Sequence, residues 1–188
     1  MQLSFAAPSL QSGGTLVLGV HGDGSFTPSA AEADKASGGA LKRAVGASTK
    51  FTGKAGQTVE VLAPQGLKAS RVLLVGMGKD FTGTGAEKLA AAVIGRLYTA
   101  GADAITFAID APKGAKFKPG MLAVHLAMGA KLRGYGFNHY RTKNREEYET
   151  TIKSVIIGTR DAAAAKKLWA AMDAVADGVH LARDLVNE

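Results

Sequence analysis

Apolar residues gather in six short runs along this chain, separated by polar or glycine-rich stretches. Two of the runs, "TLVLGV" and "RVLLVGMG", are continuously apolar and lie next to glycine, which is typical of strands buried on both faces of a sheet. "TVEVLA" mixes apolar and polar positions and suits a strand with one more exposed face. The predicted strands cover residues 3–6, 15–20, 58–63, 71–78, 104–109 and 154–158.

Helix-like stretches lie between these runs. Ser29 and Thr84 are the predicted N-caps of the first two, because a hydroxyl at that position accepts a hydrogen bond from an amide of the first turn. Gly38 and Gly39 predict a break in the first stretch, and Gly101 predicts a stop for the second. The stretches cover residues 29–46, 85–101 and 119–134, the last with Pro119 near its start.

The final stretch, with Asp161 as its predicted N-cap, has the most regular pattern. Apolar residues recur there at alternating steps of four and three, which predicts one apolar seam along a helix. We expect the start of the seam to pack on the core of the domain, and its end, around Leu185 and Val186, to face another part of a longer protein. The seam consists of Leu168, Met172, Val175, Val179, Ala182 and Val186.

Strands that alternate with helices predict the α/β class, here a three-layer sandwich with helices on both sides of a mixed, mostly parallel central sheet. No helix separates the first two predicted strands, which suggests that part of the sheet is antiparallel. The 188 residues suffice for one domain with a real core and are marginal for two.

Composition narrows the classes of function. The chain has no cysteine, which excludes disulfides, thiol nucleophiles and thiolate metal sites. Its first residues lack the basic start of a secretion signal, and no run approaches the ~20 apolar residues that cross a bilayer. We therefore expect a cytoplasmic protein without a membrane partner.

The positive charge is concentrated in one region. The net charge is +7, and residues 111–145 alone hold eight Lys and Arg and no acid, so the other residues sum to 7 − 8 = −1. Within 131–145 the basic residues alternate with aromatic ones, a pattern typical of surfaces that contact phosphates and stack on bases. A nucleic-acid-binding module is thus one hypothesis; the other is a helix C-terminus followed by aromatic residues packed under a loop. The candidate nucleic-acid contacts are Lys131, Arg133, Arg141, Lys143 and Arg145.

The sequence contains no complete catalytic or metal-binding motif, so we assign no catalytic residue and no metal ligand. "VGMGKDFTG" (75–83) has the glycines of a phosphate loop, but Phe81 replaces the third small residue of a dinucleotide fingerprint, which favours a structural turn. His21 and Asp23 lie two residues apart in a glycine-rich loop, but no second cluster of candidate ligands accompanies them in the sequence. His125 lies in a helical apolar pattern, where we expect it to be packed and hydrogen-bonded.

Three segments, in order, resemble the leucyl aminopeptidases, which are cytosolic two-metal exopeptidases: "RVLLVGMGK", "AMGAKLRGYGFNHYRTK" and "ARDLVNE". "GALKRAVGASTKFTGKAGQTVEVL" (39–62) is similar to the region that precedes the glycine turn in those enzymes. The most specific part of the resemblance combines Gly129, Tyr135, Phe137 and Tyr140 with residues 182–188.

This resemblance implies that the chain is the N-terminal domain of a longer protein. In the family the "RDLVNE" stretch closes a helix that leads into the catalytic domain, so residues 1–160 are expected to form a macro-domain-like unit and residues 161–188 a connecting helix to a missing catalytic domain. The metal ligands and catalytic Lys and Arg of the family lie in motifs that resemble N-T-D-A-E-G-R and G-K-G-x-x-x-D-S-G-G, which this sequence lacks. Lys54 in "FTGKAGQ" therefore receives no role.

The same resemblance implies what the complete protein does. Two divalent ions (Mn, Zn or Mg) in the catalytic domain would activate a water for the release of N-terminal residues such as leucine from peptides. The catalytic domains would form a homo-hexamer, and this domain, inactive alone, would stabilise or position them. Some bacterial members of the family also bind DNA. Macro domains often bind ADP-ribose, which makes residues 19–24 and 76–83 a third, weaker candidate site, since fold does not confer function.

Overall fold

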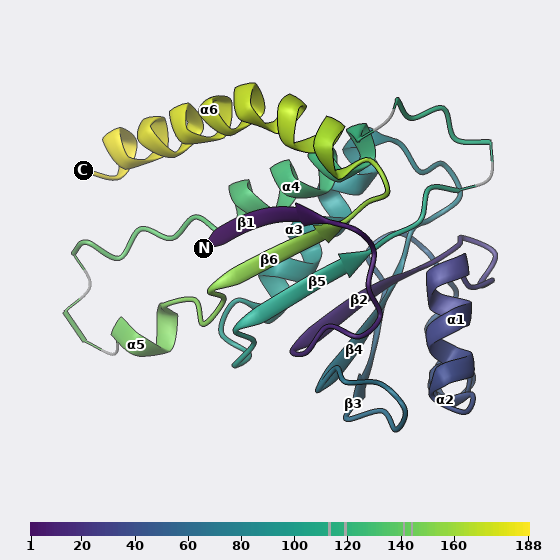
Figure 1. Cartoon of the computed structure of the whole chain (residues 1–188). Coiled ribbons are helices and arrows are strands. Elements are labelled where there is room, and N and C mark those ends of the chain that lie inside the picture. The colour runs from purple at the N-terminus through teal and green to yellow at the C-terminus, as the bar shows by residue number, and fades with distance from the viewer. Residues whose placement is uncertain (113, 119, 141, 144) are drawn as a thin grey trace.

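The computed structural model describes residues 1–112, 114–118, 120–140, 142–143 and 145–188, with the backbone alone at 145 and 146. Within these residues the strands form one sheet in the order β1-β6-β5-β2-β4-β3 (Figure 1). Neighbouring strands run parallel except in the pair β3–β4. The prediction of a mixed, mostly parallel sheet is confirmed. The strands are β1 Gln2–Ala6, β2 Thr15–Val20, β3 Thr58–Leu62, β4 Arg71–Gly76, β5 Ala104–Ala108 and β6 Ser154–Gly158.

Helices cover both faces of the sheet and give the predicted three layers (Figure 1). Every residue of β2 is buried, and its side chains alternate between the two cores: Leu16 and Leu18 face α1 and α2, whereas Val17 faces α3 and α4. α6 lies on the outside of α4 and β1. The helices are α1 Pro28–Ala36, α2 Ala40–Ala47, α3 Gly83–Leu97, α4 Met121–Arg133, α5 Arg145–Tyr148 and α6 Ala162–Asn187.

The first two strands are not the antiparallel part of the sheet, so that expectation was wrong. β1 pairs in parallel with β6 at one edge, β2 lies near the centre, and the antiparallel strand is β3, which follows α2. The connection through residues 7–14 can span up to about 27 Å, more than a five-residue strand, so the chain returns to the start of β2 without a helix.

The predicted helix boundaries needed three corrections. α3 ends at Leu97, before the predicted stop at Gly101. Thr27 rather than Ser29 is the N-cap of α1, with Pro28 in the first turn, and Thr82 rather than Thr84 caps α3 by accepting from Gly85 N–H. The break at Gly38 and Gly39 is confirmed, as is Asp161 at the N-cap of α6. Pro119 lies outside the described residues.

Candidate docking surface on the last helix

α6 packs on the rest of the domain through a narrow face. Ala165, Trp169 and Ala176 are its buried residues, spaced at four and seven positions along one side of the helix. The Trp169 ring contacts Phe5 of β1 edge to face, with 6.1 Å between ring centroids. One large aromatic residue thus anchors the helix, and alanines let the backbone approach closely on either side of it.

Polar contacts continue this face from Asp173 onward. Lys131, in the last turn of α4, pairs with Asp173 and, at 2.6 Å, with Asp177. Further along, Arg183 donates to the carbonyl oxygen of Leu132 at 2.8 Å. The second half of α6 is therefore held to the end of α4 by charged and polar groups rather than by apolar packing.

Tyr135 completes this polar corner. Its hydroxyl donates to the Asp184 carboxylate at 2.7 Å, its ring packs on His180, and the guanidinium of Arg183 lies over the same ring. Burial and the hydrogen bond to Asp184 raise the pKa of Tyr135 above its usual value near 10. For Lys131, burial opposes the charge, but Asp173 and Asp177 outweigh it and raise the pKa of Lys131 above 10.5.

The apolar seam predicted for α6 points to solvent, so the expectation that its start packs on the core was wrong. Leu168, Met172 and Val175 are 40%, 37% and 57% exposed, and Val186 is 86% exposed. Ala182 is exposed as well, and Val179 is half-buried. The steps of four and three describe the seam and the buried face equally well, because two neighbouring sides of one helix share that spacing. Trp169 is larger than any residue of the seam, and the side of the helix that carries it is the buried one.

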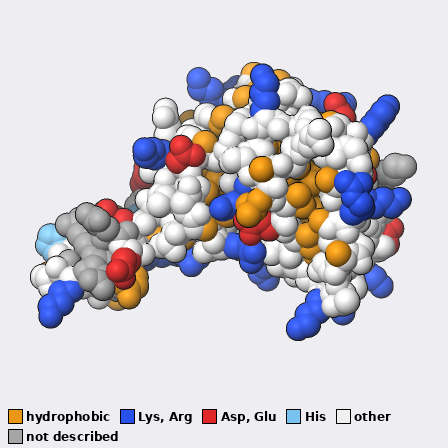
Figure 2. Space-filling model, turned by 90° about the horizontal axis from the view of Figure 1, so that it is seen from below, with side chains coloured by type: hydrophobic (Ala, Val, Ile, Leu, Met, Phe, Trp, Pro, Cys, Tyr) orange, Lys and Arg blue, Asp and Glu red, His pale blue; other side chains and the backbone are white. Residues whose placement is uncertain are grey.

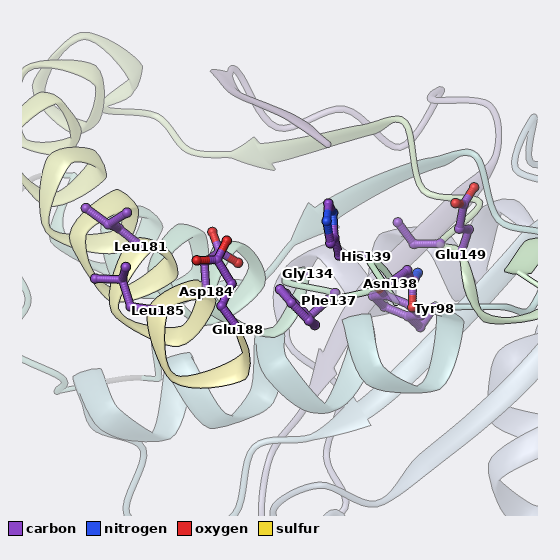
Figure 3. A pocket seen from close by; sticks show the side chains of 12 residues that line it. Tyr98, Gly134, Phe137, Asn138, His139, Glu149, Leu181, Asp184, Leu185 and Glu188 are labelled. Atoms are coloured by element: carbon purple, nitrogen blue, oxygen red, sulfur yellow. The ribbon is translucent and has the colours of Figure 1, made fainter. Parts of the chain in front are cut away.

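A cavity of about 670 Å³ opens on another side of α6, between its last two turns and the segment that follows α4 (Figure 3). Asp184 and Glu188 lie between the helix and this segment, and Leu181 and Leu185 complete the helix side at 61% and 66% exposure. Opposite them, the cavity is lined by Tyr98, Gly134, Gly136, Phe137, Asn138, His139, Glu149 and Thr150. Two exposed leucines beside Asp184 and Glu188, on the helix side of the cavity, suit a protein surface that brings aliphatic and basic side chains. We call the surface formed by Leu181, Asp184, Leu185 and Glu188 the distal flank of α6.

The structure places the candidate nucleic-acid contacts in different settings. Lys131 is paired with two carboxylates, and Arg133 lies over the ring of Tyr98 at 5.7 Å from its centroid. Lys143 is exposed, whereas Arg141 and the side chain of Arg145 lie outside the described residues. On the face in Figure 2, basic side chains are dispersed among apolar and acidic ones. Nucleic-acid binding stays a prediction.

The carboxyl edge of the sheet is where open α/β folds ordinarily bind ligands. β2 leads to a helix on one face and its neighbour β4 to a helix on the other, which makes the crevice between them a topological switch point. A cavity of about 780 Å³ lies there, and its lining includes His21, Asp23 and Lys79. Two hydrogen bonds from Ser25 lower the pKa of Asp23.

Hydrogen bonds within the chain occupy several polar groups at this edge. Met77 N–H donates to Val20 O at 2.8 Å and Gly78 N–H to Gly53 O at 3.0 Å, so these amides of the turn after β4 are not free for a phosphate. This favours the structural interpretation of "VGMGKDFTG". At the start of α1, the Asp110 carboxylate accepts from Ser29 N–H at 2.7 Å and fills the position that an anionic ligand would take.

His125 is packed and hydrogen-bonded, as predicted. Its Nδ1 lies 2.7 Å from the Glu87 carboxylate, and its ring packs edge to face on Phe117. Among the described residues, no group of three or more His, Asp and Glu side chains is placed to hold a metal ion. In the same residues, none of the helices has the length and apolarity that would span a bilayer.

Comparison with known proteins places this domain. The model of the "Cytosol aminopeptidase family, N-terminal domain" matches residues 17–144. The chain belongs to this family. A "Probable cytosol aminopeptidase" of Rhodopseudomonas palustris (strain BisA53) is 40% identical over 151 residues, which cover 79% of this chain and 30% of the relative. The matched part spans about a third of the length of such curated relatives.

Two solved structures share the fold of this family member. A tomato leucine aminopeptidase mutant superposes with a TM-score of 0.84 at 24% identity, over 100% of this chain and 38% of that one. The bottromycin maturation enzyme BotP, in complex with Mn, gives a TM-score of 0.64 at 23% identity, over 96% of this chain and 32% of that one. At these identities the likeness establishes the fold alone.

Proposed function

We propose that this chain is the non-catalytic N-terminal domain of a metal-dependent leucyl aminopeptidase that acts in the cytoplasm. The longer protein removes N-terminal amino acids, leucine above all, from peptides. In this proposal residues 1–160 form the macro-like body and residues 161–188 the helix that leads to the catalytic domain. Family membership and the name of the curated relatives support the activity.

The distal flank of α6 is the observation that carries the proposal. Leu181 and Leu185 leave two large aliphatic side chains in water on the helix nearest the junction, beside a cavity with aromatic and acidic walls. Burying the two leucines would stabilise an interface by about 1.5–3 kcal/mol each. We assign this flank to the catalytic domain, which would bring aliphatic side chains for the leucines and a basic group for Asp184 and Glu188.

The catalytic domain would also supply the metals. Two divalent ions, of Mn, Zn or Mg, bound there would polarise the scissile carbonyl and activate a water. BotP, which shares the fold of this domain, forms a complex with Mn, and this supports a metal-dependent chemistry for the longer protein. The homo-hexamer expected of the complete protein would form through its catalytic domains, with this domain placed outside them.

A chimera tests the proposal. This chain would replace the matching N-terminal third of the Rhodopseudomonas palustris relative, and hydrolysis of a leucyl arylamide would be measured with Mn²⁺. We expect activity in the chimera and none in the 188-residue chain alone. Activity of the chain alone that survives repurification would overturn the non-catalytic role.

Two variants of the chimera test the distal flank. Leu181→Asp combined with Leu185→Asp places two carboxylates beside Asp184 and Glu188 and should separate the domains, with a loss of at least about tenfold in thermal half-life. Val175→Asp, on the seam, has a similarly exposed starting side chain and should leave the half-life unchanged. Equal effects of the two changes would contradict the assignment of this flank.

A further inference from the structure

The exposed seam of α6 has the same spacing in both directions. Its six apolar positions follow steps of four, three, four, three and four, so the pattern is symmetric about residue 177. When two copies of the helix lie antiparallel, each apolar position of one therefore faces an apolar position of the other. The seam is about 27 Å long, at 1.5 Å per residue.

A second feature stands at one end of the seam. A cavity of about 760 Å³ lies beside Leu168, where the start of α6 meets the start of α4. Phe117, Met121 and Ala164 give it apolar walls, and three lysines stand around it. At the other end of the seam stands Val186, which at 86% is the most exposed of the large apolar side chains described. The lysines are Lys116, Lys118 and Lys167.

We propose that two copies of this chain associate through these seams, antiparallel, about a two-fold axis near residue 177. Val186 of each copy enters the lysine-rimmed cavity of the other beside Leu168. Met172 then lies opposite Ala182 of the second copy, and Val175 opposite Val179. Large and small side chains alternate across this contact, which is how facing helices interdigitate.

Charge favours the antiparallel arrangement over the parallel one. The C-terminal end of a helix carries a partial negative charge from its unpaired carbonyl groups, and Glu188 adds a carboxylate there. In the antiparallel pair this end approaches the three lysines around the cavity of the other copy. In a parallel pair, the lysines of both copies would meet at one end and the negative ends at the other.

This inference goes beyond the proposed function and can hold together with it. At 100° per residue, Leu181 and Leu185 lie roughly 100–140° around the helix axis from the seam. The second copy and the catalytic domain would thus contact different sides of α6. The failure of one assignment leaves the other standing, because Val175 belongs to the seam alone and Leu181 to the distal flank alone.

Sedimentation equilibrium of the 188-residue chain tests the association. We expect a monomer–dimer equilibrium between about 1 and 500 μM, since a contact of one helix pair is small. Val175→Asp places two carboxylates near the two-fold axis and should weaken the dimer at least about 100-fold. Leu181→Asp, at 61% exposure against 57% for Val175, is the matched control and should leave it unchanged. A wild-type chain that stays monomeric, or a dimer lost only in Leu181→Asp, would overturn the inference.

Disulfide trapping tests the orientation of the two helices. Because the chain has no native cysteine, disulfides can form only between the introduced ones. The single variants Leu168→Cys and Val186→Cys are mixed in equal amounts and oxidised. The antiparallel pair should give the mixed disulfide between the two variants as the main product. Mixing Leu168→Cys with Leu181→Cys, which lies on the distal flank, should give none. Disulfides between two copies of Leu168→Cys as the main product would show a parallel pair and refute the proposed axis.

Discussion

The carboxyl edge of the sheet and the surface of α6 differ in what their polar and apolar groups contact. At the sheet edge, the amides of Met77 and Gly78 and the carboxylate of Asp110 are bonded within the chain. Along the second half of α6, Arg183 and Asp184 bond to the end of α4 and the segment after it, while leucine and valine side chains face water on two sides. The fold that usually binds ligands at its sheet edge has here most of its exposed large apolar side chains, among the described residues, on α6.

The difference separates fold from function in this domain. A parallel sheet with a topological switch point suggests a nucleotide crevice, but a crevice binds an anion only if its amides are free. An amphipathic helix buries its apolar side when the domain is complete in itself. α6 buries Trp169 and two alanines on one side but leaves leucine and valine side chains exposed on two others, which is what one expects of a helix with further protein contacts.

The largest effect should come from the anchor of α6. Trp169→Ala removes a ring that is 8% exposed and packed on Phe5, and should cost about 3–5 kcal/mol of unfolding free energy in urea. Leu185→Ala, on the same helix at 66% exposure, should cost less than about 0.5 kcal/mol. A similar cost for both would mean that the distal flank is not free, and would remove the contrast between the two sides of the helix.

A smaller effect should come from the hydrogen-bonded carboxyl edge of the sheet. Gly53 and Gly24 have almost the same backbone angle, φ +79° and +83°, so alanine at either costs about 1–2 kcal/mol for the left-handed conformation. At Gly53 the added methyl would also collide with the carbonyl oxygen of His21, whereas no described atom lies within 4 Å of it at Gly24. We expect the destabilisation by Gly53→Ala to exceed that by Gly24→Ala by about 1–3 kcal/mol.

Urea unfolding of the two glycine variants is the measurement. Equal losses would show that the loop around residue 53 can move away from the edge of the sheet. The amides bonded at this edge could then be freed for a ligand, and the candidate nucleotide site at residues 19–24 and 76–83 would regain weight.

Much of the fold could be predicted because it rests on local patterns. The ends of each predicted strand lie within two residues of the observed ends, since buried parallel strands are continuous apolar runs bounded by turns. Strand order could not be predicted. The pairing of β1 with β6 is set by a long-range choice between edges, and nothing in residues 7–14 encodes it.

The candidate docking surface could be predicted only in part, for a physical reason. The sequence indicates the seam of α6 but not whether the seam faces the core or the solvent, because Leu168 and Trp169 start two neighbouring stripes with the same spacing. The basic segment was a reasonable signal for phosphate contact, but sequence does not show that Lys131 has two carboxylates beside it. Leu181 and Leu185, four residues apart and off the seam, were the signal that could have revealed the distal flank.

The smallest effect, and the most specific, should appear at alkaline pH in the polar corner that holds α6. The pKa of Tyr135 is raised in the folded protein, so the native state keeps its phenolic proton where the unfolded state loses it. Stability from this group is therefore constant below about pH 10 and falls as the pH rises from there through the folded pKa. The raised pKa of Lys131 acts in the same direction above about pH 10.5.

Tyrosinate absorbance at about 295 nm isolates the first group as the difference between the wild-type chain and Tyr135→Phe. The midpoint of this difference curve should lie above about pH 10 and move toward that value in Asp184→Asn, which removes the negative charge of the group that accepts the hydrogen bond from the phenol. Asp177→Asn removes a carboxylate that faces Lys131 instead and should leave the curve in place. If Asp184→Asn does not move the midpoint, the hydroxyl does not bond to α6 in solution. The contacts of Lys131 and Arg183 would then carry the attachment of the second half of the helix, and the distal flank would be held less firmly in place for a partner.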